Sequence, residues 1–512
     1  MAFKIYCLSD LLFQHQGAEA SRIALIDGDQ SVTYAALMAR TRFFAVQLQQ
    51  RGIKRSDRVA IFMRRSVDAV ASFFAVHYLG AVAVILNDKL KPQQIDHIVN
   101  HAGASGLVTE RQLSRTLTSL ELQDCFILNV EDLGDGVDND NALGPCRVIG
   151  QDLALIIYTS GSTGLPKGIM LSHNNLLSGA EIISDFMSLT KDDRLISLLP
   201  FSFDYGLNQL LTMMLVGGTL VIQRSLFPAD ICRTLQKHEV TGMAGVPLLW
   251  SQLAGPYSPF NKSEFPKLRY ISNTGGVFPE NLVKLYRQTH PHLKIYLMYG
   301  LTEAFRSTIL PSDQVDKRPK SMGKAIPNVE ILVVNDEQQE CAPGEPGELV
   351  HRGANIALGY WRDRQATEKV YRPHPYRRTE NGMEEMVVYS GDIVKKDEEG
   401  YLYFVGRKDG MIKNLGVRVS PEEIEHHIYA SGLVSGAVAF SRPRDDTTND
   451  IVAVVAPRNN AEFDESQLQA YCAKEMPEYM RPTVFSFMDE LPKLGSGKPD
   501  RQAIREAFLA QQ

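Results

Sequence analysis

The chain has few of the features that define several protein classes. Its 512 residues contain six cysteines, scattered without a CxxC pair, which argues against a disulfide framework and against a zinc site. Basic residues are not in excess, since 54 lysines and arginines face 60 acidic residues, for a formal net charge of -6. Such a chain has no general attraction for nucleic acid or an anionic membrane. We therefore expect any anionic ligand to be held by a local site.

Long apolar segments are also scarce. The N-terminal sequence MAFKIYCLSDLLFQHQ has too short an apolar run for a secretory signal. Residues 69–86 approach the length of a membrane span, but His77 and Gly80 interrupt them, and we expect a buried helix followed by a buried strand. No fixed-period repeat is visible. These absences, with the scattered thiols, predict a cytoplasmic protein without a membrane span.

The pattern that is present is that of an α/β protein. Apolar runs rich in β-branched residues, such as residues 59–63, 81–86 and 153–158, alternate with longer amphipathic stretches, as in folds with buried parallel strands. A chain of 512 residues is too long for one ordinary core, so we expect at least two domains. The texture changes near residue 409, and we predict domains over residues 1–408 and 409–512, the second a small α+β domain.

One loop carries the strongest chemical signal. Residues 158–172 read YTSGSTGLPKGIMLS and follow an apolar run directly. Closely spaced backbone N–H groups, hydroxyls and one lysine are what the oxygens of a polyphosphate need. The loop does not satisfy the P-loop pattern, because Lys167 is followed by glycine. Flexible linkers have a similar composition, so the loop alone leaves both interpretations open.

The loop resembles the signature of the AMP-forming adenylating enzymes, which include acyl-CoA synthetases, luciferases and the adenylation domains of peptide synthetases. Further signatures of this family follow in the family's order: YGLTE at 299–303, GELVHRGANIALGYW at 347–361, YSGD at 389–392, GRKDGMIKNLGVRVSPEEIE at 406–425 and LPKLGSGKPDR at 491–501. The resemblance implies a large N-terminal domain of packed, parallel-rich sheets and helices with a small β-barrel-like part. It also implies a small mobile C-terminal α+β domain.

The same resemblance implies the reaction and its catalytic residues. A carboxylate attacks the α-phosphorus of ATP, pyrophosphate leaves, and a thiol then displaces AMP from the acyl-adenylate. Glu303 would hold Mg²⁺ and Thr302 would bond the α-phosphate, while Lys498 would reach between the substrate carboxylate and that phosphate. Lys167 would contact the phosphates. Taken singly, Glu303 is more typical of a helix-capping or surface acid, and Lys498 of a solvated lysine. Leu494 replaces a threonine common in the family.

Further roles also come from the resemblance. The nucleotide would be bound by Thr159, Ser160, Gly161, Ser162, Thr163, Gly164, Gly275, Gly276, Tyr299, Gly300, Asp392 and Arg407. Tyr299 would lie against adenine, and Asp392 would accept the ribose hydroxyls. Asp409 would be the hinge of the small domain, and Gly416 and Arg418 would face the pantetheine of the incoming thiol.

The acid substrate is the most open question. In the stretch LLPFSFDYGLNQLL, Asp204 stands where amino-acid-activating relatives place the partner of the substrate's ammonium group. The pocket would also include Tyr205, Asn208, Ala244, Ser272, Thr274, Met298, Arg306 and Ser307. Such a polar lining favours an amino acid or a small polar acid over a long acyl chain.

Several alternatives remain open. Arg306 could bind a second anionic or carbonyl group of the substrate, or pair with Asp204 and cancel its charge. A small acyl or aryl acid is the other candidate substrate. The thiol could belong to CoA or to a separate carrier protein. An amide-forming ligase or a nucleotide-binding relative without catalysis would share the same motifs.

Overall fold

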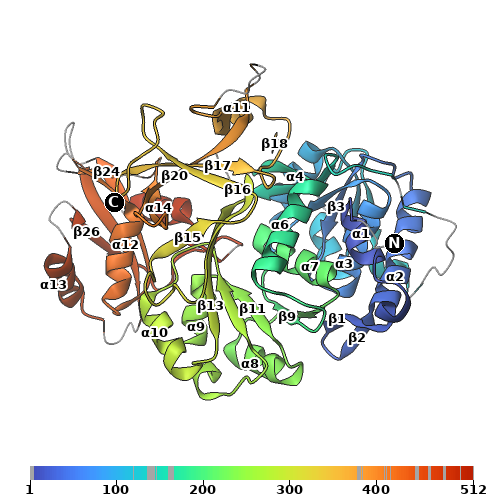
Figure 1. Cartoon of the computed structure of the whole chain (residues 1–512), viewed down its shortest axis with the longest axis horizontal. Helices are drawn as coiled ribbons and strands as arrows, with labels where there is room; N and C mark the ends of the chain where they lie inside the picture. The colour runs from blue at the N-terminus through green and yellow to red at the C-terminus, as the bar shows by residue number, and fades with distance from the viewer. Residues whose placement is uncertain are drawn as a thin grey trace. The chain divides into compact units, whose positions relative to one another are not determined.

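The structure of the protein is a computed structural model. It describes residues 5–510 except 119, 135, 137–143, 146, 160–165, 378–381, 383, 409, 411, 415–416, 444–448, 459–462, 477–479 and 496, and residues 413–414, 417–418, 443 and 449 by their backbone alone. The chain forms two compact units, described separately below (Figure 1). The first comprises Met1–Ile331 and His351–Val388, and the second Leu332–Val350 and Tyr389–Gln512. The domain boundary expected after residue 408 stays a prediction.

One sheet of the first unit has the strand order β18-β8-β7-β4-β3-β5-β6. Its strands are β3 (Arg58–Phe62), β4 (Val82–Ile85), β5 (Ala104–Thr109), β6 (Phe126–Asn129), β7 (Leu153–Thr159), β8 (Lys167–Ser172) and β18 (Gly359–Tyr360). The strands from β7 to β6 are parallel, whereas β8 and β18 pair antiparallel. Strands β3 and β4 are almost wholly buried, as their Val, Ala and Ile content predicts for central parallel strands.

A second series of strands in this unit has the order β15-β14-β13-β12-β11-β9-β10-β1-β2. These strands are β1 (Ile23–Asp27), β2 (Gln30–Thr33), β9 (Arg194–Ser197), β10 (Thr219–Ile222), β11 (Gly242–Gly245), β12 (Tyr270–Asn273), β13 (Lys294–Leu301), β14 (Ala304–Leu310) and β15 (Ser321–Ala325), with β19 (Tyr371–Pro373) beside β20. Strands β9, β11, β12 and β13 are parallel to one another, and β14 returns antiparallel. The parallel strands all end at the same edge of the sheet, where ligands bind in many α/β proteins.

The helices of the first unit include the predicted buried helix. They are α1 (Leu8–Phe13), α2 (Tyr34–Gln50), α3 (Val67–Tyr78), α4 (Pro92–Ala102), α5 (Arg111–Ser114), α6 (His173–Phe186), α7 (Asp204–Val216), α8 (Pro228–Lys237), α9 (Pro247–Leu253), α10 (Glu280–Thr289) and α11 (Arg364–Val370). Short 3-10 helices are η1 (Gly17–Ser21), η2 (Arg115–Leu117), η3 (Val130–Asp132) and η4 (Phe260–Lys262). Helix α3 begins where Ser66 accepts a hydrogen bond from Ala69, and β4 follows it. Residues 69–86 thus form a buried helix and a buried strand, as predicted. No helix among the described residues is long and apolar enough to cross a membrane.

The second unit contains a small sheet covered on both faces. It consists of β24 (Val434–Pro443), β25 (Asn449–Pro457) and β26 (Val484–Phe487), with α12 (Pro421–Ala430), α13 (Glu465–Glu475) and α14 (Arg501–Ala510). Alternate residues of β25 face opposite sides. Ile451, Ala453 and Val455 join the core with α12 and α13, whereas Val452 and Val454 join the core with α14. This is the predicted α+β fold (orange to red in Figure 1).

The remaining strands of the second unit form antiparallel pairs. They are β21 (Leu402–Arg407), β22 (Ile412–Asn414) and β23 (Val417–Val419), and the boundary between the units passes through β16 (Val329–Val334), β17 (Pro346–Gly353) and β20 (Met386–Lys396). In the part of β20 that belongs to the second unit, Asp392 lies directly opposite Arg407 of β21. The register of this pair therefore brings together two residues that the sequence predicts to bind nucleotide.

Candidate active site

A tight hairpin presents two of the predicted catalytic residues. Strands β13 and β14 are antiparallel with Leu301 opposite Ala304, so Thr302 and Glu303 form the two-residue connection. Every residue of β14 is buried, which fixes the base of the hairpin in the core. The predicted Mg²⁺ ligand and the predicted α-phosphate contact therefore sit in one turn at the edge of a buried sheet.

Glu303 is linked to the lysine of the glycine-rich loop through a tyrosine. The Tyr360 hydroxyl donates a hydrogen bond to Oε1 of Glu303 at 2.5 Å. The Nζ of Lys167 lies 5.8 Å from the centre of the Tyr360 ring and 3.3 Å from Oδ2 of Asp363. Tyr360 belongs to the motif at residues 347–361, from which no role was predicted for it. Tyr360 thus lies between the predicted Mg²⁺ ligand, Glu303, and the lysine predicted to contact the phosphates, Lys167.

The pairing of β7 with β8 places the two ends of the glycine-rich loop side by side. Thr159 lies opposite Lys167 in the register of these strands. The residues predicted between them, Ser160, Gly161, Ser162, Thr163 and Gly164, lie outside the described residues. Thr159 and Lys167 are therefore the described ends of the predicted phosphate site.

The predicted adenine contacts follow neighbouring parallel strands. Gly275 and Gly276 follow Thr274 in the loop after β12, and Tyr299 is close to the end of β13, which pairs with β12. Gly275 has a positive φ of 76°, and a Cβ on Gly276 would lie 3.0 Å from Cγ of Pro247. A larger residue would strain both positions. The turn itself thus favours glycine at these positions, whether or not a base approaches it.

Tyr299 stacks on a buried histidine. Its ring lies 6.1 Å from that of His351, at an interplanar angle of 15°. Burial lowers the pKa of His351 to about 3, so the imidazole is neutral at physiological pH. We expect His351 to support the tyrosine ring from behind as an uncharged side chain.

The predicted acid pocket is a buried polar cluster. Asp204 is the first residue of α7, is 7% exposed, and accepts a hydrogen bond from the Tyr205 N–H at 2.7 Å. The Tyr205 hydroxyl lies 2.5 Å from Oγ of Ser272 in β12, and the guanidinium of Arg306 lies 4.2 Å from the centre of the Tyr205 ring. Thr274 is buried in the loop after β12. The structure therefore brings α7, β12 and β14 together at this cluster.

The remaining predicted lining residues occupy the strands around this cluster. Ala244 lies opposite Ser272 on neighbouring strands, and Met298 lies on β13 opposite Ile309. Ser307 is fully buried, and its hydroxyl donates to the carbonyl of Ala304. All these positions belong to the first unit.

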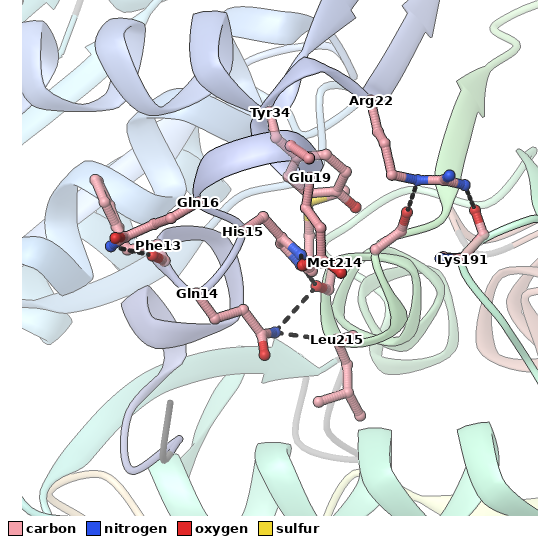
Figure 2. A network of polar contacts seen from close by, with 12 residues as sticks. Phe13, Gln14, His15, Gln16, Glu19, Arg22, Tyr34, Lys191, Met214 and Leu215 are labelled. Atoms are coloured by element: carbon pink, nitrogen blue, oxygen red, sulfur yellow. Dashed lines mark hydrogen bonds and ion pairs between the residues drawn. The ribbon is translucent and has the colours of Figure 1, made fainter. Parts of the chain in front are cut away.

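The far end of α7 is held by the N-terminal segment. Figure 2 shows Gln14, His15, Arg22 and Tyr34 around the carbonyls that end this helix. A ring nitrogen of His15 lies 2.6 Å from the carbonyl oxygen of Met214, Gln14 donates to Leu215 at 3.2 Å, and Tyr34 donates to the Gly218 carbonyl at 2.8 Å. Carbonyls at a helix end otherwise lack partners within the helix. The N-terminal segment thus anchors the helix whose other end carries Asp204.

In the second unit, the predicted ribose contacts form an ion pair. Oδ1 of Asp392 lies 3.0 Å from Nη1 of Arg407, and Asp392 is buried. The Asp392 N–H donates to the Ser390 hydroxyl, which donates to the carbonyl of Leu349. Next to the pair, Lys408 lies 3.0 Å from Oε2 of Glu348. Asp392 is therefore held on buried backbone rather than in a mobile turn.

Lys498 occupies a different setting. It is exposed in the turn before α14, where its carbonyl accepts a hydrogen bond from the N–H of Leu494 at 2.8 Å. The Gly497 N–H donates to the Leu494 carbonyl, and Gly497 has a positive φ of 83° that favours glycine. Despite the substitution of leucine for threonine, the turn has a bonded backbone. Asp409, Gly416 and the side chain of Arg418 lie outside the described residues.

The donor set suits a magnesium ion that is bound mainly by phosphates. Within the described residues, no group of three or more His, Cys, Asp or Glu side chains could hold a metal. Mg²⁺ typically takes one or two protein carboxylates and completes its shell with waters and substrate phosphates. Glu303, beside the glycine-rich loop, is a carboxylate of that kind.

Comparisons with known proteins agree with these features. Residues 12–361 match the AMP-binding enzyme family, and residues 423–498 match the AMP-binding enzyme C-terminal domain. The chain is 28% identical, over 98% of its length and 94% of the relative's, to a long-chain-fatty-acid–CoA ligase of Escherichia coli O157:H7. It is 29% identical over 96% of its length to tyrocidine synthase 3 of Brevibacillus parabrevis, but it spans only 8% of that protein.

Solved structures extend the likeness. ATP-bound MatB from Rhodopseudomonas palustris is 26% identical, with a TM-score of 0.88 over 98% of this chain and 99% of that one. The o-succinylbenzoate CoA synthetase MenE of Bacillus subtilis, in complex with its acyl-adenylate intermediate, is 25% identical, with a TM-score of 0.84 over 97% of both chains. MenE has also been solved with ATP and magnesium ion. On its fold, its motifs and these matches, the chain belongs to the AMP-binding enzyme family.

Proposed function

We propose that this protein is an ATP-dependent, AMP-forming ligase that joins a carboxylic acid to a thiol. The observation that carries the proposal is the grouping of Lys167, Tyr360 and Glu303, with a 2.5 Å hydrogen bond between the last two. A cation next to Thr159 and a carboxylate joined to Tyr360 support the phosphate and Mg²⁺ roles proposed for this segment. Family membership then supplies the reaction class.

In the first half-reaction, an oxygen of the substrate carboxylate forms a bond to the α-phosphorus of ATP. The bond from that phosphorus to the bridging oxygen breaks, and pyrophosphate leaves. Such transfers are accelerated mainly by positioning and by fixed positive charge. We assign Lys167 and the loop from Thr159 to the leaving phosphates, and Lys498 to the carboxylate and the α-phosphate. Mg²⁺ held by Glu303 would neutralise phosphate charge.

The nucleotide assignments follow the same logic. Asp392, held on β20, would accept the ribose hydroxyls, with Arg407 as its neighbour. Tyr299 and the Gly275–Gly276 turn would flank adenine. We retain the domain division at residue 408 and the hinge at Asp409 as parts of the proposal, with the smaller domain turning between the two half-reactions.

In the second half-reaction, a thiol sulfur attacks the acyl carbon and AMP leaves. Gly416 and Arg418 are the proposed thiol contacts. The thiol belongs to CoA or to the phosphopantetheine arm of a carrier protein, and the relatives include both a CoA ligase and tyrocidine synthase 3. The five described cysteines are unpaired, which accords with a reducing compartment such as the cytoplasm.

For the acid, we propose a small polar acid, with an amino acid as the first candidate. Asp204 supports this choice because a buried carboxylate favours a cationic partner, and a substrate ammonium group would provide one. The second candidate is a small acyl or aryl acid, as in MenE. In that case Asp204 would only stabilise the N-terminus of α7, because a carboxylate is favourable at that end of the helix dipole.

The test is pyrophosphate–ATP exchange with the purified protein, without any thiol, across amino acids, short acyl acids and aryl acids. Exchange with an amino acid that is abolished in Asp204→Ala would support aminoacyl activation. Exchange confined to acids without an amine would assign Asp204 to the fold. If no acid supports exchange in a protein that binds ATP and Mg²⁺, the ligase proposal is wrong.

A further inference from the structure

The predicted acid pocket contains an arginine whose guanidinium has no hydrogen bond or ion pair among the described residues. Arg306 is 4% exposed, and its Nε and Nη2 are shielded from solvent with no hydrogen-bond partner in the described part of the chain. The same residue has a positive φ of 82°, which is uncommon for a residue other than glycine. A buried, unpaired guanidinium on an unusual backbone is costly, so it calls for a function.

The surrounding residues hold Arg306 in place without supplying an acceptor within hydrogen-bond distance of its Nε or Nη2. The Asn355 side-chain amide donates to the Arg306 carbonyl, and the Tyr205 ring lies under the guanidinium at 4.2 Å. Stacking on a ring recovers only part of the solvation that a buried charge loses. No ion pair joins Arg306 to Asp204 among the described residues, although burial lowers the pKa of Arg306 and the charge of Asp204 opposes this.

A polar side chain on α7, Asn208, is also buried with a donor atom that has no hydrogen-bond partner in the described chain. Asn208 is 3% exposed, and its Nδ2 is without a hydrogen-bond partner in the described chain. It follows Tyr205 by three residues and Asp204 by four, so all three lie on one face of the helix. Because Tyr205 contacts Arg306, the unused donors of Asn208 and Arg306 come from two elements that meet at one cluster.

Two arginines that serve the fold of this unit show a different pattern. Arg269, which serves the fold of the same unit, lies 2.5 Å from Oδ1 of the buried Asp193. Arg40 likewise forms two hydrogen bonds to the carboxylate of Asp68. Arg306 has no such acceptor within the described residues, and unused N–H groups in a pocket are donors for a ligand.

We propose that Arg306, with Asn208, binds a second carboxylate of the acid substrate, so that the substrate class is a small dicarboxylic acid. One carboxylate is adenylated and the other accepts hydrogen bonds from the guanidinium. This inference rests on the proposed ligase function. It does not depend on an amino group, which Asp204 would bind separately.

The experiment is pyrophosphate–ATP exchange with matched acid pairs. Each dicarboxylic acid of three to six carbons, with and without an α-amino group, is compared with the monocarboxylic acid of the same chain length. We expect the preferred dicarboxylic acid to exceed its partner by at least about 100-fold, because a site that keeps buried donors rejects an analogue without the acceptor.

Two variants test the residue itself. Arg306→Asn removes the guanidinium while placing at this positive φ a residue that tolerates it, and Arg306→Lys keeps the charge but not the planar fork. Arg306→Asn should reduce the preference to below about 5-fold while ATP binding, measured by calorimetry, is retained. Arg306→Lys should keep part of the preference.

The outcomes separate the two proposals. A preference for the monocarboxylic partner, or a preference that survives in Arg306→Asn, overturns the inference and leaves the ligase proposal intact. Absence of exchange with every acid, in a protein that binds ATP and Mg²⁺, overturns the ligase proposal and the inference with it.

Discussion

Each unit of the molecule contains a buried acid near an arginine, and the two arrangements differ. In the second unit, Oε2 of Glu425 lies 2.6 Å from Nη2 of Arg501, and its Oε1 accepts the Ala439 N–H at 2.6 Å. In the first unit, Asp204 and Arg306 are both buried, yet no ion pair joins them in the described chain. The carboxylate oxygens of Glu425 both have partners within the fold, and they connect α12 with β24 and α14. Nε and Nη2 of Arg306 have no partner among the described residues, so they are available to a ligand.

The second unit contains the same contrast over a short stretch of chain. Arg501 begins α14 and bonds Glu425, whereas Lys498, three positions earlier, is exposed in a turn. One cation should therefore matter for stability and the other for chemistry. Both expectations can be measured separately.

The largest expected effect is on catalysis. Lys498→Ala should lower the rate of acyl-adenylate formation by about 100- to 1,000-fold, as removal of a fixed charge from a reacting centre does. Its unfolding free energy in urea should match that of the wild type, because the side chain is exposed. ATP binding should change little. Unchanged activity in the purified variant would remove Lys498 from the site.

The next effect is on stability. Arg501→Met leaves Glu425 buried without its cation, and should lower the free energy of unfolding by about 1–3 kcal/mol. We keep the lower range because the Arg501 side chain is 43% exposed. The matched control is Arg306→Met, which removes an unpaired buried charge and should cost less than about 0.5 kcal/mol or stabilise the protein. Equal losses in the two variants would erase the distinction between the pairs.

The pH dependence of stability should identify Glu425. Burial, opposed by Arg501, raises its pKa to about 7 from an ordinary value of 4.5. The folded state therefore holds a proton that the unfolded state has lost between these values, so this group's contribution to stability is present at low pH and disappears as pH rises toward 7. Between about pH 5 and 7.5, wild type should lose about 1–2 kcal/mol relative to Glu425→Gln. Parallel curves for the two proteins would contradict this.

Much of the fold and of the first-unit site could be predicted from the sequence alone. Residues 69–86 formed the predicted helix and strand because a continuously apolar segment of that length must be buried, and buried backbone forms helices or sheet strands. Asp204, Tyr205, Ser272 and Arg306 were expected around one pocket; the fold brings Tyr205 into contact with Ser272 and Arg306, and the binding of an acid there stays a prediction. The expectation for the pocket residues rested on the spacing of the family motifs, which carries tertiary information that composition does not.

Other features depend on atomic contacts that no motif contains. For Arg306 the sequence left two alternatives open, an ion pair with Asp204 or contact with a ligand. The choice depends on the distance between the side chains of Arg306 in β14 and Asp204 in α7, which no motif contains. The anchoring of α7 by Gln14 and His15 was missed for the same reason, since these residues are remote in sequence from the helix they cap. The role of Tyr360 also required its 2.5 Å bond to Glu303.

The smallest expected effect is on Mg²⁺ affinity, and it tests a hydrogen bond between a carboxylate and a neutral donor instead of an ion pair. Tyr360→Phe removes the hydrogen bond to Glu303 and leaves the ring beside Lys167. Groups that orient a metal ligand typically contribute about 10-fold in metal affinity, so the Mg²⁺ concentration for half-maximal exchange should rise by about that factor with little change at saturating Mg²⁺. Exchange measured against Mg²⁺ at fixed ATP separates this result from a loss of ATP affinity. If the Mg²⁺ dependence of the variant matches that of the wild type, the hydrogen bond from Tyr360 does not contribute to Mg²⁺ binding by Glu303. The Arg501–Glu425 ion pair would then be the better example of one side chain that fixes the state of another.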